Sequence, residues 1–268
     1  MIPTEEELRQ RYNPEGSILR RHQLRMLEML EVIDGICRKH NIPYWLSSGT
    51  LLGAARHKGF IPWDDDLDIE LLRKDYLRLM KILPTELPSH LALQTHETDP
   101  NYIFIFAKVR DRRSYLEEPN SYDRIFRERG IYIDIFPLEE MPYSLAWISE
   151  HMQGRIFNQL NNKQLKEEVM LRRIRRIYRF NERIGYPILR FLSHFFPCKK
   201  LRHSFGTAVH SPRSMKEIFP LSEAEFEGKK FPVPHNLHAF LTRYYGNYQK
   251  LPDLDKLHPH CSQITFES

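Results

Sequence analysis

Apolar residues in the first half of the chain recur at helical spacing in some segments and at alternate positions in others. Between residues 18 and 39, leucines and isoleucines return every three or four positions with charged residues between them, which predicts an amphipathic helix. Shorter helices are predicted at 50–57 and 73–83, the second ended by Pro84. Apolar and alternating segments predict strands at 44–47, 66–70, 91–95, 103–110 and 131–136. This mixture indicates an α+β fold.

The strand pattern fades in the second half of the chain. Residues 144–195 are predicted to be almost wholly helical, and 235–245 to form a last helix ended by Gly246. The Phe-Pro-Val-Pro sequence at 231–234 is predicted to be a turn. We therefore expect a core with an N-terminal helix over residues 1–142. A mainly helical, basic C-terminal region over residues 143–268 should pack on it.

Composition excludes several classes of protein. A hydrophobic content of 41% in 268 residues is enough to bury a core, which excludes wholesale disorder. No apolar run reaches the roughly 18 residues of a membrane span, and the N-terminus lacks a signal-peptide pattern. Cys37, Cys198 and Cys261 form neither a zinc-binding spacing nor a disulfide framework. These features predict a protein of a reducing compartment, in the cytoplasm.

The densest group of chemically active residues is an aspartate run. Asp66 and Asp68 alternate with apolar residues, so they share one face of the predicted strand, and Asp64 joins them if the strand begins early. Neighbouring carboxylates repel one another, and Mg²⁺ relieves that repulsion while sharing its oxygen ligands with substrate phosphates. An acidic solvated loop is the alternative. A calcium loop of the EF-hand type is disfavoured because Ile69 occupies the place of its required glycine.

Two further segments fit a phosphate-transfer site. Ser48, Gly49 and Thr50 form a small-residue turn between a strand and a helix, and backbone N–H groups at such a helix start bind phosphate. Asp134 stands alone in the apolar strand at 131–136, where an acid is either exposed at an edge or functional. A turn, an Asp-apolar-Asp pair and a third acid from a later strand match the nucleotidyltransferase pattern.

Three segments together resemble the LicD family of phosphocholine and polyol-phosphate transferases, which are related to fukutin and fukutin-related protein. They are SGTLLGAARHKGFIPWDDDLDI at 48–69, IDIFPL at 133–138, and the ordered fragments FEG, FPVP and YGNY between 226 and 248. The first is long and specific, and the others are moderate but occur in the right order. The resemblance covers most of residues 20–260.

The resemblance implies a nucleotidyltransferase-like mixed sheet with flanking helices. It implies transfer of a phosphorylated head group from a CDP-linked donor to a hydroxyl of a cell-surface glycan, with release of CMP and with Mg²⁺ or Mn²⁺ as cofactor. Matched residue by residue, Asp66, Asp68 and Asp134 are the expected catalytic acids, and Asp64 joins them as a metal ligand. Gly49 and Thr50, with Ser48, are the expected phosphate-binding turn.

Three basic residues are weaker candidates for the same site. Lys108 and Arg110 share one face of the predicted strand at 103–110, where they either hold the donor diphosphate or belong to an exposed strand face. Arg56 follows the phosphate-binding helix, and its alternative is a plain surface turn.

Residues 171–203 form the most basic segment, in which arginines alternate with large apolar residues. Three interpretations stay open: a solvated helix face, peripheral contact with an anionic membrane that carries a lipid-linked acceptor, or RNA binding. No RNA-binding motif supports the third, so no nucleic-acid partner is expected. Pro187 should divide the segment into two short helices.

Two alternative functions remain. A nucleotidyltransferase that moves the nucleotide itself to a small molecule or glycan would use the same acids, because only the phosphorus that is attacked differs. A non-catalytic basic RNA- or membrane-binding module would account for residues 171–203, but it would not need the four aspartates.

Overall fold

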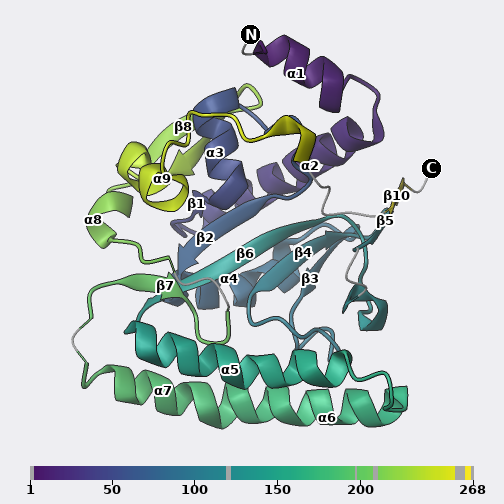
Figure 1. Ribbon diagram of the computed structural model, residues 1–268, viewed down its shortest axis with the longest axis vertical. Helices are drawn as coiled ribbons and strands as arrows, with labels where there is room; N and C mark the ends of the chain where they lie inside the picture. The colour runs from purple at the N-terminus through teal and green to yellow at the C-terminus, as the bar shows by residue number, and fades with distance from the viewer. Residues whose placement is uncertain (1–2, 119–121, 197, 208–210, 257–262, 267–268) are drawn as a thin grey trace.

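The computed structural model describes residues 3–118, 122–196, 198–207, 211–256 and 263–266. Its centre is a six-stranded mixed sheet with the strand order β1-β2-β6-β4-β3, and β7 also pairs with β6 (Figure 1). Only β2 and β6 run parallel within this sheet. The strands are β1 (Trp45–Leu46), β2 (Asp68–Leu72), β3 (Leu91–Gln94), β4 (Ala107–Asp111), β6 (Tyr132–Glu140) and β7 (Leu201–His203). The predicted α+β fold is confirmed.

The helices of the first half lie where they were predicted, but the predicted helix end at Pro84 is wrong, because α4 (Arg73–Glu86) continues through Pro84 to Glu86. The long amphipathic helix α2 (Ile18–Lys39) begins at Ser17, whose side chain accepts a hydrogen bond from the Arg20 N–H. Its buried face contributes to the main core together with the sheet and α4. The short helices α1 (Glu5–Tyr12) and α3 (Ser48–His57) lie near α2 at one end of the molecule (Figure 1).

The predicted helical segment after residue 142 is confirmed, but the expected break at Pro187 is wrong. The helices α5 (Tyr143–Leu160), α6 (Glu167–Phe180) and α7 (Tyr186–Ser193) form a layer below the sheet (Figure 1). A π-helical stretch, η2 (Asn181–Gly185), joins α6 to α7 without a loop. Pro187 lies in the first turn of α7. Proline cannot donate the backbone hydrogen bond of a regular helix. The wider π turn before Pro187 lets the chain stay helical without that bond.

Several short strands were not predicted. They are β5 (Ser114–Glu117), which pairs with β10 (Gln263–Phe266), and β8 (Ser222–Phe226), which pairs with β9 (Lys229–Val233). The predicted turn at 231–234 is wrong, because most of it lies in β9. A two-stranded sheet leaves one edge of β9 unpaired, so Pro232 is tolerated there without a donor.

The remaining elements are all short helices. They are η1 (Tyr122–Ile125), α8 (Met215–Ile218), α9 (Leu237–Tyr245) and η3 (Leu254–Lys256). Gly246 ends α9 as predicted, with a positive φ of 64°.

The region after residue 142 is tied to the sheet as well as packed beneath it. Its strand β7 pairs with the end of β6, and its helices α5 and α6 enclose a second apolar cluster with Tyr102 and Ile103. The division at 142 and 143 stays a prediction. Among the described residues, no helix is both long enough and apolar enough to cross a membrane.

Candidate active site

Strand pairing brings the predicted acids together. In the parallel pair β2 and β6, Asp68 lies opposite Asp134, and the Asp134 N–H donates to the Leu67 carbonyl at 2.9 Å. On the other side of β6, Lys108 of β4 is the partner of Asp134. Three neighbouring strands therefore place two carboxylates and one ammonium group in a row across the sheet.

The start of α3 lies against the same acids. The Asp68 N–H donates to Thr50 Oγ1 at 2.8 Å, and the Ser47 N–H donates to the Asp68 carbonyl at 3.0 Å. The Ser48 side chain hydrogen-bonds the Asp68 carboxylate. A Cβ atom on Gly49 would lie 2.5 Å from Asp64 Oδ2 and 3.6 Å from Asp66 Oδ1. A Cβ atom there would push the Asp64 carboxylate aside, so the turn residues and the acids form one site.

The four carboxylates act on one another electrostatically. Burial raises the pKa of Asp68 well above its usual value, and the charges of Asp66, Asp134 and Asp64 raise it further. Burial also raises the pKa of Asp134, against the opposing effect of Lys108. The cluster therefore carries more negative charge than its surroundings neutralise.

Lys108 and Arg110 are buried, so they do not form the exposed strand face that was the alternative to phosphate binding. Lys108 Nζ lies 2.8 Å from Asp134 Oδ1 and 3.3 Å from the centre of the Tyr132 ring. Arg110 donates to the Gln94 side chain and to the Gly130 carbonyl, both at 2.8 Å. These contacts hold Lys108 at the acid cluster and Arg110 in the core. Their role in holding a diphosphate stays a prediction.

Arg56 lies at the mouth of the site rather than in a plain surface turn. Its guanidinium donates to His57 Nε2 at 2.8 Å and to the Tyr248 carbonyl at 3.1 Å, which ties α3 to the C-terminal segment. A cavity of about 440 Å³ opens there, and Arg56, Trp63, Asp64 and Tyr245 are among its lining residues. Of the four acids of the cluster, Asp64 lines this cavity, and Asp66, Asp68 and Asp134 do not.

The chemistry of these side chains suits a hard divalent cation. In the described part of the chain, no three His, Cys, Asp or Glu side chains converge closely enough to hold a metal ion by themselves. Mg²⁺ commonly takes only one or two protein carboxylates and fills its other positions with water and substrate phosphates. One or two of the carboxylates of Asp66, Asp68 and Asp134 would therefore suffice as ligands for an ion that arrives with a phosphorylated donor.

Sequence reasoning missed a buried polar network beneath the cluster. Glu70, two positions after Asp68 on β2, accepts hydrogen bonds from Trp45 Nε1 at 3.0 Å and Arg213 Nη2 at 2.5 Å, and His203 Nε2 lies 2.9 Å away. These contacts outweigh burial and lower the pKa of Glu70 to about 2. The alternation that selected Asp66 and Asp68 also selects Glu70. His203 and Arg213 carry no local signal.

Another missed residue fixes the loop before β2. Gln23 of α2 is buried, and its Nε2 donates to the Asp64 carbonyl at 2.8 Å and to the Ile61 carbonyl at 3.3 Å. Neighbouring His22 is also buried, which lowers its pKa to about 4 despite the nearby charges of Asp65 and Asp66. A neutral His22 adds no positive charge to the cluster.

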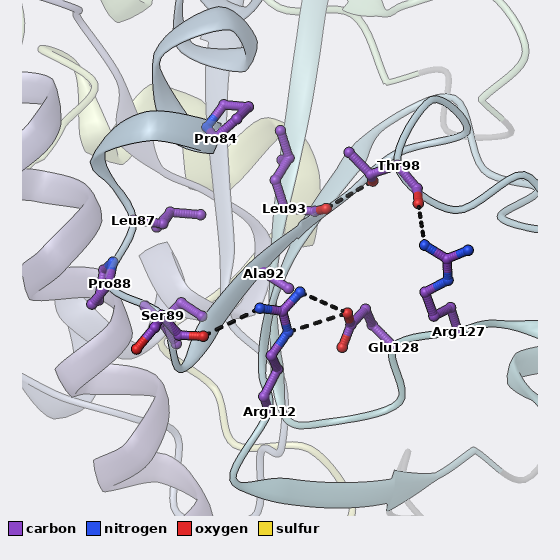
Figure 2. Close-up of a pocket in the computed structure, with 11 residues that line it drawn as sticks. Pro84, Leu87, Pro88, Ser89, Ala92, Leu93, Thr98, Arg112, Arg127 and Glu128 are labelled. Atoms are coloured by element: carbon purple, nitrogen blue, oxygen red, sulfur yellow. Dashed lines mark hydrogen bonds and ion pairs between the residues drawn. The ribbon is translucent and has the colours of Figure 1, made fainter.

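A second cavity, of about 490 Å³, lies between the end of α4 and β3 (Figure 2). Its wall is held by internal bonds, since Arg112 donates to Glu128 Oε1 and to the Ser89 carbonyl, as Figure 2 shows. None of the acids of the cluster lines it. We therefore place the active site at the acid cluster and not in this cavity.

Known proteins resemble this chain over most of its length. Residues 41–169 match the family model for the LicD/FKTN/FKRP nucleotidyltransferase domain, a range that contains all four acids of the cluster. The lipopolysaccharide cholinephosphotransferase LicD of Haemophilus influenzae is 29% identical over 270 aligned residues, covering 92% of this chain and 97% of that protein. The human ribitol 5-phosphate transferase FKRP is 42% identical over 48 residues, which are 18% of this chain and 10% of FKRP. The mouse ribitol-5-phosphate transferase FKTN is 38% identical over 52 residues, 19% of this chain and 11% of FKTN. The resemblance to the LicD family seen in the sequence is confirmed, with a LicD-family domain at residues 41–169, and the chain is a phosphotransferase of the LicD type.

Proposed function

We propose that this enzyme transfers a phosphorylated head group, phosphocholine-like or a polyol phosphate, from a CDP-linked donor to a hydroxyl of a cell-surface glycan. The reaction releases CMP and uses Mg²⁺ or Mn²⁺. The relative that aligns along nearly the whole chain is named a lipopolysaccharide cholinephosphotransferase, and the partial relatives are named ribitol-phosphate transferases. The proposal places the enzyme in the cytoplasm, with peripheral contact to the membrane that carries the acceptor.

One structural observation carries the proposal: Asp68 and Asp134 face each other across a parallel strand pair, beside the N-terminus of α3. N–H groups in the first turn of a helix have no partner within the helix, and the helix dipole favours anions there. Gly49 lets a phosphate approach this turn closely, because no Cβ intervenes. The turn and the carboxylates thus lie side by side, where a phosphate and its cation would be bound together.

The protein side chains have separable tasks in this proposal. Asp66, Asp68 and Asp134 would hold the divalent ion, with Asp64 beside them. When bound, that ion would neutralise the donor diphosphate and stabilise the charge that develops on the leaving CMP. Lys108 acts as a positioning residue, because its ammonium group holds the Asp134 carboxylate in one orientation.

The direct test is incubation with a panel of CDP-linked donors, an acceptor glycan and Mg²⁺, with release of CMP as the readout. Asp66→Ala and Asp68→Ala should each abolish CMP release while the protein stays folded. Asp253→Ala is the matched control, since Asp253 is exposed and lies outside the cluster. A cluster variant that keeps substantial activity would overturn the assignment of the site.

The same reaction separates the proposal from transfer of the nucleotide itself. With a donor labelled in the cytidine and in the head group, the proposed reaction leaves only the head-group label on the acceptor. Cytidine label on the acceptor would instead show nucleotidyl transfer. Full activity with excess chelator would remove the metal from the proposal.

A further inference from the structure

The outer face of the continuous α6–η2–α7 helix carries large apolar side chains that the core does not use. Its inner face is buried against α5 through Ile174, Tyr178 and Leu189. In Figure 1 this helix forms the lower edge of the molecule, with α5 between it and the sheet. The exposed apolar residues are separated by three or four positions and are 49% to 67% exposed. They are Phe180, Ile184, Ile188 and Phe191 in the helix and Phe195 in the turn directly after it.

A row of arginines runs beside this apolar row. The spacing is again three or four residues, and the exposed members are Arg172, Arg176, Arg179 and Arg183. Arg179 and Arg183 each directly precede a member of the apolar row, so the two rows adjoin. The apolar row and the arginine row together form one surface, the docking face. Arg175 does not belong to it, because its guanidinium donates twice to Asn101 Oδ1, at 3.1 and 2.8 Å.

Few acids oppose these arginines. Glu167 and Glu168 occupy the first turn of α6, and Glu182 is half-buried beside the charges of Arg190 and Arg73. The docking face therefore combines an apolar surface with a strong positive charge along more than 20 residues of helix.

We propose that the docking face binds an anionic lipid bilayer, with the α6–α7 helix lying in the plane of the membrane–water interface. An amphipathic helix binds there by burying its apolar face at the acyl boundary while basic residues contact lipid head groups. Adjoining rows of phenylalanine or isoleucine and of arginine match that layered environment. A second copy of the chain on the same face would bring further arginines against the first row, so charge complementarity favours the anionic lipid.

This inference rests on the membrane contact in the proposed function and assigns that contact to one helix. Its test can fail separately from the proposed reaction, because binding to vesicles requires neither donor nor acceptor. Each basic residue near an anionic surface strengthens partitioning by about fivefold. Reversal of two arginines should therefore weaken vesicle binding by far more than tenfold, since each reversal removes an attraction and adds a repulsion.

The experiment is co-sedimentation of the full chain with neutral phosphatidylcholine vesicles and with vesicles that also contain phosphatidylglycerol, at low and high salt. Two double variants test the two rows: Arg172→Glu with Arg176→Glu, and Ile188→Ser with Phe191→Ser. Lys216→Glu with Lys230→Glu is the matched control, because it makes the same change in net charge at exposed residues outside the docking face. Thermal melting checks that every variant is folded.

We expect the wild type to sediment with the anionic vesicles, less so at high salt, and both docking-face variants to stay in solution while the control still binds. Equal sedimentation with neutral and anionic vesicles, or none with either, would overturn the proposal. So would equal losses in the control and in the arginine variant. A concentration-dependent dimer that the Ile188→Ser, Phe191→Ser variant abolishes would assign the face to a second copy instead.

Discussion

The ionised carboxylate of Asp68 should destabilise the fold when no divalent cation is present. Burial, followed by the charges of Asp66, Asp134 and Asp64, raises its pKa well above the ordinary value of 3.8. A carboxyl group whose pKa is raised on folding stabilises the protein fully below its ordinary pKa, and this stabilisation is lost as pH rises through the folded pKa. The metal-free enzyme should therefore lose stability as pH rises from about 4.

The substitution Asp68→Asn should remove this pH-dependent loss of stability, because asparagine has the shape of aspartate but cannot ionise. The asparagine Oδ1 can still accept a hydrogen bond from Ser48, which hydrogen-bonds the wild-type carboxylate. Each unit by which the pKa is raised destabilises the ionised form by about 1.4 kcal/mol. One kcal/mol moves the Tm of a chain of this size by about 2–4 °C. We therefore expect the Tm of the metal-free variant to exceed that of the wild type by at least about 3 °C near pH 8.

The assay is scanning calorimetry in the presence of chelator, at steps between about pH 4 and pH 8. The difference in Tm between variant and wild type should shrink toward the acid end, and Asp253→Asn should show no such trend. Added Mg²⁺ should raise the Tm of the wild type more than that of the variant. An unchanged or lower Tm for Asp68→Asn near pH 8, or a difference independent of pH, would refute the reasoning.

Three further substitutions test other parts of the site. Asp134→Asn should lose most CMP release and weaken the stabilisation by Mg²⁺, whereas full activity at saturating Mg²⁺ would remove Asp134 from the site. Gly49→Ala places a Cβ atom 2.5 Å from Asp64 Oδ2, so we expect at least about a tenfold loss of kcat/KM for the donor; Gly154→Ala, where a Cβ meets nothing within 4 Å, is the control. Glu70→Gln removes the buried anion beside Arg213 and His203 and should lower the free energy of unfolding near neutral pH by about 3–5 kcal/mol. The Glu70 pKa is lowered to about 2, so its stabilisation is present above its ordinary 4.5 and is lost as pH falls through about 2. Urea unfolding measures this, and a loss below about 1 kcal/mol would contradict it.

Local patterns made much of the fold and of the acid cluster predictable. The helix at 18–39 was predicted with the bounds that α2 has, because its periodicity and its Ser17 cap lie within the segment itself. The acids were predicted from strand alternation over 66–70, but β2 begins at Asp68, so Asp66 lies in the segment before the strand. The Asp68 and Asp134 register could not be derived from either segment, since it depends on β2 and β6 being neighbours in the sheet.

Contacts between distant segments explain what the sequence did not reveal. The strand β7 is only three residues long and pairs with the end of β6, which is far from it in the sequence. The prediction of a turn at 231–234 relied on its prolines. Pro232 nevertheless lies in the strand β9, because the unpaired edge of that strand needs no N–H donor.

Pro137 is tolerated within β6 because its backbone nitrogen, which has no hydrogen to donate, faces a place where no strand is paired. Since the Asp134 N–H points toward β2, the missing donor of Pro137 faces the opposite side. There it falls between Ile135, which pairs with Ala107 at the start of β4, and Leu138, which pairs with His203 at the end of β7.

Two acids on one strand show how this protein separates a structural charge from a functional one. Asp68 and Glu70 point to the same face of β2, and both are buried. Glu70 is neutralised by Arg213 and held by Trp45 and His203, so its pKa is low and the strand is fixed in place. Asp68 is surrounded by other acids and its pKa is high. A strained group persists only where its surroundings hold it firmly. The Glu70 network therefore stabilises the strand position at which Asp68 keeps an uncompensated negative charge for a cationic cofactor.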